Sequence, residues 1–307
     1  MASYSVTKES PYESVFGHAR TWATENPQRP LFLFALVDAG QDKLTWERLS
    51  RLSTNKLSLL NTEDSAADAF SPQLLDFGVV FESNTPLETA LSARNPTTAF
   101  TLLCSTLSST DLHRHLAQFV EVRLSGNMEM LLAFWDPAIL ATLVGQKEDD
   151  SLHVPGPVLA VEQMQAFLSP IVAWWYCDRE SRWHRIDPPT TDAGHNLDEQ
   201  RLSLTQQQED MLVEASVPDQ ILYHLELNQP HLFDTDKTHA MRYGFVKAVL
   251  GPARQLGLTG MRDLVNFTAL CLIYRRRMHT DPAIARLLDQ VQSKAITLDQ
   301  ALPLMPE

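Results

Sequence analysis

A polar segment at residues 187–199 divides this sequence into two parts with different hydrophobic patterns. Before the segment, continuous apolar runs such as Leu31–Val37 have the length of a buried strand and are bounded by turn-forming residues. After it, apolar residues recur at three- and four-residue spacing, which is typical of amphipathic helices. The segment itself has almost nothing to bury. We therefore expect two domains of different fold class joined by a linker at 187–199.

The first part, residues 1–186, predicts an α/β (α+β) lobe with a mixed sheet and short helices, whose core spans about 30–186. Residues 53–72 are polar, and we expect them to be irregular. Strands are expected at 31–37, 74–81, 100–104, 121–124, 128–134, 172–177 and 183–186, and helices at 12–23, 45–52, 86–93, 111–119 and 138–144.

The second part, residues 200–307, predicts an all-α lobe. Thr205 and Gln208 have the spacing of a capping box, which starts a helix, and Gly257 suits a helix end. Helices are expected at 205–227, 237–256, 261–277, 282–293 and 296–302.

The charge is unevenly distributed between the two parts. Residues 1–199 hold 14 Lys and Arg against 26 Asp and Glu, or −12, whereas residues 200–307 hold 11 against 12, or −1. An acidic first part has no basic surface that could displace the counterions of phosphates, so we expect no nucleic-acid partner. The acidity permits a basic protein partner.

The chain is expected to be cytoplasmic and bacterial. No stretch approaches the roughly 20 apolar residues that span a bilayer, so we expect no membrane insertion. Residues 1–30 lack the apolar region of a secretory signal. Cys104, Cys177 and Cys271 lie far apart in apolar surroundings, which indicates reduced thiols that fill the core.

The residue types of a catalytic site do not occur here in a recognisable arrangement. The sequence contains no nucleophile elbow, phosphate loop or dinucleotide-binding glycine pattern. His113 and His115 point in different directions on a helix and indicate a solvated face, and the acidic run at 148–150 indicates a solvated turn. His224, His231 and His239 lack the companions of a zinc site. We expect no metal, no cofactor and no enzymatic activity.

Two segments are candidates for binding a partner. Trp174, Trp175 and Tyr176 would alternate between the two faces of a strand, where they fill the core or anchor an interface. Arg275, Arg276 and Arg277 lie at the end of an expected helix. They complement the helix dipole there, or they bind an acidic partner.

Four segments, taken in order, resemble those of a known family. They are the strand end Phe34–Asp38, the helix around Leu112–Leu116, the aromatic run Phe134-Trp135-Asp136-Pro137, and Gly156-Pro157. This order and spacing are similar to those of type VI secretion adaptor chaperones of the Tap/Tec type, long grouped as a domain of unknown function. Two arginines of the family pattern are replaced, by Ala133 and Ala138.

These motif residues also have a physical interpretation that does not depend on the family. Asp136 and Pro137 suit the first positions of a helix, as the capping residue and the first-turn proline. A buried aromatic strand end, Phe134-Trp135, then leads directly into that helix. We expect these residues to be structural.

The resemblance implies an adaptor that binds a cognate secreted effector, a toxin, and helps to load it onto the VgrG spike protein. It implies that the N-terminal lobe binds the spike and that the C-terminal lobe binds the effector. An immunity-type protein that neutralises a toxin remains an alternative. A hydrolase is another, because Asp38 ends a strand where α/β enzymes place catalytic groups; a lone Asp there equally forms a turn.

Overall fold

The computed structural model describes residues 11–60, 71–79, 87, 89, 98–189 and 201–306. The chain divides into two compact units, Met1–Leu212 and Val213–Glu307. Each unit is built around buried hydrophobic residues of its own. The boundary falls within one long helix, α8 (Gln206–Asn228).

An antiparallel sheet of six strands forms the centre of the first unit, in the order β2-β3-β1-β4-β7-β8. Its central strand β1 is the apolar run that the sequence predicted, and its partners on either side are β3 and β4. The bounds are β1 Phe32–Asp38, β2 Asn55–Ser58, β3 Pro72–Val79, β4 Phe100–Ser105, β7 Ile171–Cys177 and β8 Trp183–Ile186.

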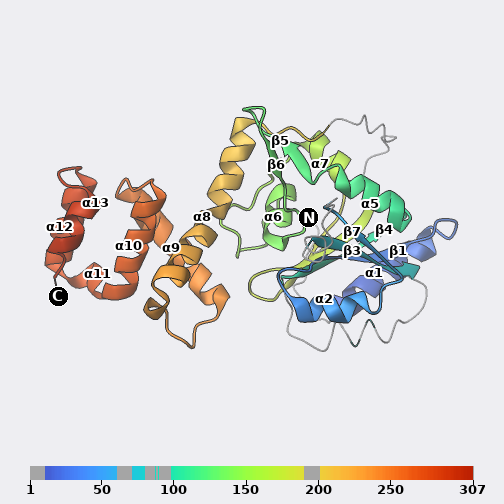
Figure 1. The fold of residues 1–307 in the computed structure, drawn as a ribbon, viewed down its shortest axis with the longest axis horizontal. Coiled ribbons are helices and arrows are strands. Elements are labelled where there is room, and N and C mark those ends of the chain that lie inside the picture. The colour runs from blue at the N-terminus through green and yellow to red at the C-terminus, as the bar shows by residue number, and fades with distance from the viewer. Residues whose placement is uncertain are drawn as a thin grey trace. The chain divides into compact units, whose positions relative to one another are not determined.

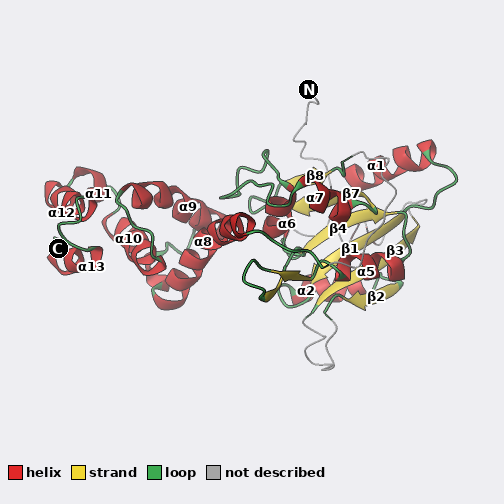
Figure 2. Ribbon diagram, turned by 90° about the horizontal axis from the view of Figure 1, so that it is seen from above, coloured by secondary structure: helices red, strands yellow, loops and turns green. Residues whose placement is uncertain are grey.

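Helices cover both faces of this sheet (Figures 1 and 2). Side chains alternate along β1, so that Phe34 and Leu36 enter one core while Leu33, Ala35 and Val37 enter the other. Helices α1 (Pro11–Glu25) and α2 (Lys43–Ser50) contribute to the second core, and α5 (Ser109–Ala117), α6 (Pro137–Val144) and α7 (Val161–Leu168) contribute to the first. Because both faces are buried, the central strands β1 and β4 are mostly apolar.

A separate hairpin, β5 (Glu121–Arg123) and β6 (Glu129–Leu131), lies between α5 and α6 in the chain. The segment 201–205 extends this part of the unit, since the amide of Arg123 donates to the carbonyl of Leu202 and the amide of Leu204 donates to the carbonyl of Arg123.

The second unit is helical throughout the part that the structure describes. After α8 come the short turn η1 (Pro230–Leu232), α9 (His239–Gln255), α10 (Met261–Tyr274), α11 (Arg277–Thr280), α12 (Pro282–Gln292), α13 (Leu298–Ala301) and η2 (Leu302–Leu304). The capping box at the start of α8 forms as expected, with reciprocal hydrogen bonds between Thr205 and Gln208.

The predicted fold classes are confirmed: a sheet with short helices precedes an all-helical part. Residues 53–72 were expected to be irregular, but they supply the edge strand β2, and α7 was not predicted at all. The helix expected at 86–93 and the greater part of the expected linker, 190–199, lie outside the described residues.

The division between the compact units differs from the position expected from the sequence. It falls at residue 212, because 201–212 belongs with the first unit. Leu202 and Leu204 are buried in the core of that unit, and the side-chain amide of Gln208 donates to the carbonyl of Val158. None of the helices that the structure describes is long and apolar enough to cross a bilayer.

Candidate functional site

The motif around Asp136 builds the start of α6. The Asp136 carboxylate accepts hydrogen bonds from the amides of Ala138 and Ile139, at 2.8 and 3.2 Å, and Pro137 occupies the first turn. Phe134 is completely buried and packs edge-on against Trp135. The capping role expected for Asp136 and Pro137 is confirmed.

Asp38 forms the turn after β1. One carboxylate oxygen accepts hydrogen bonds from the amides of Gly40 and Gln41, at 3.0 and 3.2 Å. This arrangement is the turn that an Asp at a strand end favours. The structure therefore explains Asp38 without a catalytic role.

Gly156 and Pro157 lie where the chain passes very close to the end of α6. Gly156 has φ +73°, and a β-carbon at this position would overlap the carbonyl oxygen of Thr142. That same carbonyl accepts a hydrogen bond from the amide of Val158 at 3.1 Å. The position therefore requires glycine for two independent reasons, its backbone conformation and the absence of space.

The aromatic segment of β7 lies in the hydrophobic core. Trp174, Trp175 and Tyr176 are 0, 1 and 0% exposed. Trp174 and Tyr176 belong to the core on one face of the sheet, and Trp175 to the core on the other, as the strand alternation predicted. Their role as interface anchors is not supported, because side chains this deeply buried offer a partner no surface.

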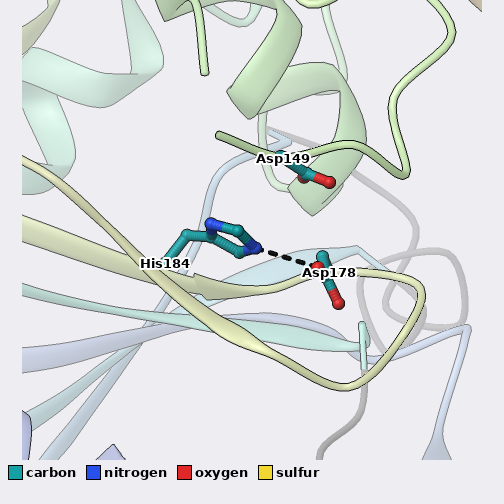
Figure 3. Close-up of side chains that lie close together, drawn as sticks. All are labelled: Asp149, Asp178 and His184. Atoms are coloured by element: carbon teal, nitrogen blue, oxygen red, sulfur yellow. Dashed lines mark hydrogen bonds and ion pairs between the residues drawn. The ribbon is translucent and has the colours of Figure 1, made fainter. Parts of the chain in front are cut away.

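A buried polar cluster lies at the end of the β7–β8 hairpin (Figure 3). It consists of Asp149, from the loop after α6, Asp178, from the hairpin turn, and His184, on β8. One potential ligand atom from each lies within 4.8 Å of the others. The acidic run at 148–150 was expected to be a solvated turn; that interpretation is wrong for Asp149, which is 2% exposed.

Protein donors already occupy the oxygens of this cluster. Asp178 accepts hydrogen bonds from Arg182 Nε at 2.7 Å and from the amides of Glu180 and Arg182, and it bonds His184 Nε2 at 2.9 Å. Asp149 accepts hydrogen bonds from the amide and hydroxyl of Ser151 and from the Tyr176 hydroxyl. A metal ion would have to displace several of these donors, including a guanidinium.

The charges of the cluster also indicate a structural role. Burial raises the pKa of Asp178, but the hydrogen bonds from His184 and Arg182 outweigh it and leave the pKa below its ordinary value. Burial beside Asp149 raises the pKa of Tyr176, which keeps its hydroxyl protonated as a donor. The cluster thus ties the loop after α6 to the hairpin, and its donor set does not resemble an open metal site.

The paired histidines of α5 have separate structural partners. His113 Nε2 lies 2.6 Å from the carbonyl oxygen of Ser58, and His115 Nε2 lies 2.9 Å from that of Phe167. The expected solvated face is wrong for His115, which is 5% exposed, because α5 buries that side chain against α7. The two histidines therefore contact different carbonyl groups.

The three thiols are unsuited to nucleophilic chemistry. Burial raises the pKa of Cys104 and of Cys177 to about 12 in each case, and that of Cys271 to about 11. A thiol with such a pKa is protonated near neutral pH, where the reactive thiolate is scarce. All three are free, as the sequence predicted.

The arginine run lies at the turn between α10 and α11 and is exposed. Arg275 has φ +47°, which a residue with a side chain rarely adopts, and its guanidinium pairs with Asp234 at 2.8 Å. Arg277 stacks over the ring of Tyr274, 5.3 Å from its centre, and pairs with Asp281. Arg276 has no ion pair within the described part of the chain.

Two of these arginines border a groove in the second unit with a volume of about 900 Å³. Its walls come from α9, α10, α11 and α12, and Arg275 and Arg276 are among the residues that line it. The sequence predicted the helices and singled out the arginines. The groove itself was missed, because a helical periodicity shows an apolar stripe but not whether another helix covers it.

Comparison with known proteins gives one match. Residues 33–153 match the model of a domain of unknown function, DUF4123. The matched region spans the chain from β1 to the loop after α6 and lies within the first unit. No curated protein and no solved structure matches the chain. Over those residues the chain is similar to DUF4123.

Proposed function

We propose that this protein is a bacterial cytoplasmic adaptor of type VI secretion, which binds a cognate toxin effector and helps to load it onto the VgrG spike. The observation that carries the proposal is the DUF4123 match over residues 33–153. That family is commonly associated with type VI secretion adaptors. The order of the motif residues within the matched region supports the same assignment.

The two-unit organisation supports a protein that holds two partners. The match is confined to the first unit, so this unit carries whatever the family shares. The second unit has a separate core and an open groove. We assign the spike to the first unit and the effector to the second.

We propose that the adaptor is not an enzyme. The residues that a hydrolase would use have other partners. Asp38 forms a turn. Asp178 bonds Arg182 and His184, and Asp149 accepts a hydrogen bond from the Tyr176 hydroxyl. A catalytic carboxylate needs access to substrate, which side chains 2 to 4% exposed do not have.

Co-purification tests the proposal. The tagged full chain is co-expressed with the spike protein and the toxin encoded beside its gene. We expect both to be retained through size-exclusion chromatography. Retention of neither protein would contradict the adaptor function. Complete inhibition of the toxin's activity by the purified chain, without binding to the spike, would favour the immunity alternative instead.

A further inference from the structure

One face of α9 lines the groove along nearly the whole helix. The lining residues on α9 recur at helical spacing and are mostly apolar: Met241, Phe245, Ala248, Val249 and Pro252, with Leu256 directly after the helix. From Met241 to Gln255 the groove extends over 14 residue steps, or about 21 Å at 1.5 Å per residue. Its length is that of several helical turns rather than that of a compact small molecule.

The groove is open to solvent along this length. Met241 is 52% exposed, and Ala248, Pro252 and Gln255 are exposed as well. A helix normally turns such an apolar stripe towards a core. An acyl chain lying here would keep one side in water. An amphipathic helix would instead cover the groove with its apolar face and leave its polar face in solvent.

Positive charge gathers at one end of the groove. Lys237 and Arg242 belong to the beginning of α9 and the residues before it, and Arg275 and Arg276 follow the end of α10. Among the described lining residues, Asp234 is the one acidic side chain. The lining therefore contains four cationic side chains and one acidic side chain.

Two of the four cations have acidic partners within the unit. Arg275 pairs with Asp234, and Arg242 pairs with Glu226 at 3.0 Å. Lys237 and Arg276 are exposed and have no ion pair among the residues that the structure describes. Their charge is therefore available to an anionic group of a ligand.

We propose that this groove binds an amphipathic helix of the effector that carries acidic residues at one end and a stripe of apolar side chains along one face. The acidic end lies against Lys237 and Arg276, and the apolar stripe covers the open face of α9. This inference rests on the proposed function only in naming the effector as the source of the helix. The groove's own chemistry, apolar with a cationic end, selects the ligand.

The binding test uses the purified full chain and two pooled sets of synthetic helical peptides. Each peptide has about 16 residues, enough to follow the groove at 1.5 Å per residue. The first set carries Leu, Phe or Met on one face and Glu in one end turn, and the second has Lys in place of Glu. Palmitate is the third probe. Fluorescence anisotropy measures peptide binding, and isothermal titration calorimetry measures binding of palmitate directly.

Two groove variants and two matched controls identify where the peptides bind. Ala248→Glu places a bulky charge in the middle of the groove, and its control is Ala285→Glu on α12, also exposed but outside the lining. The double variant Lys237→Glu with Arg276→Glu reverses the free charges. Its control changes Arg286 and Lys294 to Glu; both residues are exposed and neither lines the groove. Circular dichroism checks that each variant is folded.

We expect members of the Glu set to bind the wild type, at least about tenfold more tightly than their Lys counterparts. Each folded groove variant should weaken this binding by about tenfold or more, while the two controls should leave it unchanged. Failure of the whole Glu set to bind, equal binding of both sets, or unchanged binding to folded Ala248→Glu would overturn the inference. So would binding of palmitate with no binding of either peptide set.

The same variants separate this inference from the proposed function. If the toxin co-purifies with wild type and equally with folded Ala248→Glu, the adaptor function stands and the groove assignment is wrong. If no toxin is captured but the Glu peptides bind as described, the groove assignment stands and the adaptor function is wrong.

Discussion

The two units of this protein differ in how completely they bury their apolar side chains and pair their charged ones. In the first unit, helices bury both faces of the sheet. Hydrogen-bond partners within the unit are present for the acidic side chains of Asp38, Asp136, Asp149 and Asp178. In the second unit, one face of α9 stays open, and Lys237 and Arg276 have no ion pair among the described residues. Polar groups that all have partners within their own unit indicate a scaffold. An open apolar groove with charges that have no ion pair indicates a surface that binds a partner.

The largest effect on stability is expected at Gly156, where the first unit has no space for a side chain. Gly156→Ala should lower the free energy of unfolding of that unit by about 3 kcal/mol, because it combines a strained backbone with overlap at the Thr142 carbonyl. Urea denaturation followed by tryptophan fluorescence measures it.

The matched control for this change is Gly126→Ala in the β5–β6 turn, where an added β-carbon would have no heavy atom within 4 Å. We expect it to change the free energy of unfolding by less than about 1 kcal/mol. Similar losses for the two variants would show that the close approach at Gly156 contributes nothing.

The buried cluster gives a smaller effect that depends on pH. Asp178→Asn should cost about 2 kcal/mol at neutral pH, because it weakens the charge-assisted hydrogen bonds from Arg182 and His184. The pKa of Asp178 is lowered on folding, so its stabilisation is complete above the ordinary carboxyl pKa of about 4 and is lost as the pH falls through the folded value.

The stability difference between wild type and Asp178→Asn should therefore shrink as the pH is lowered below about 4. Denaturation at a series of pH values checks this trend. Asp187→Asn, at a half-exposed ion pair with Arg185, is the control and should change stability by less than about 1 kcal/mol. A difference for Asp178→Asn that stays constant across this range would contradict the assignment.

The smallest effect is expected in the groove. Changing Lys237 and Arg276 together to Ala should alter the free energy of unfolding by no more than about 0.5 kcal/mol, since exposed charges without ion pairs contribute little to stability. Thermal denaturation of the double variant tests this. A loss of several kcal/mol would mean that these cations serve the fold, as the polar groups of the first unit do.

Local patterns predicted the parts of this fold that depend on neighbours in sequence. The β1 run, the alternation of Trp174, Trp175 and Tyr176, and the Asp136 cap each follow from backbone geometry and burial within a few residues. The edge strand β2 was missed because its four residues, Asn-Lys-Leu-Ser, are mostly polar. It is a strand because it pairs with β3, and sequence alone does not show that pairing.

The candidate sites depend on contacts between distant residues, which is why they were harder to predict. Asp149 sits in an acidic run that looks solvated, and its burial arises from Tyr176 on β7. In the second unit, Arg275 and Arg276 were identified by their charge. Their position beside an apolar groove follows from the packing of α9 against α10, for which no short motif exists.

We propose that the chain holds two different partners, the spike and the toxin, at once. Native mass spectrometry of the full chain co-expressed with the neighbouring spike and toxin proteins tests this proposal. We expect a species whose mass includes all three proteins. In the Ala248→Glu variant, we expect that species to lose the toxin and keep the spike. Separate complexes with the spike and with the toxin, and never the three together, would contradict it.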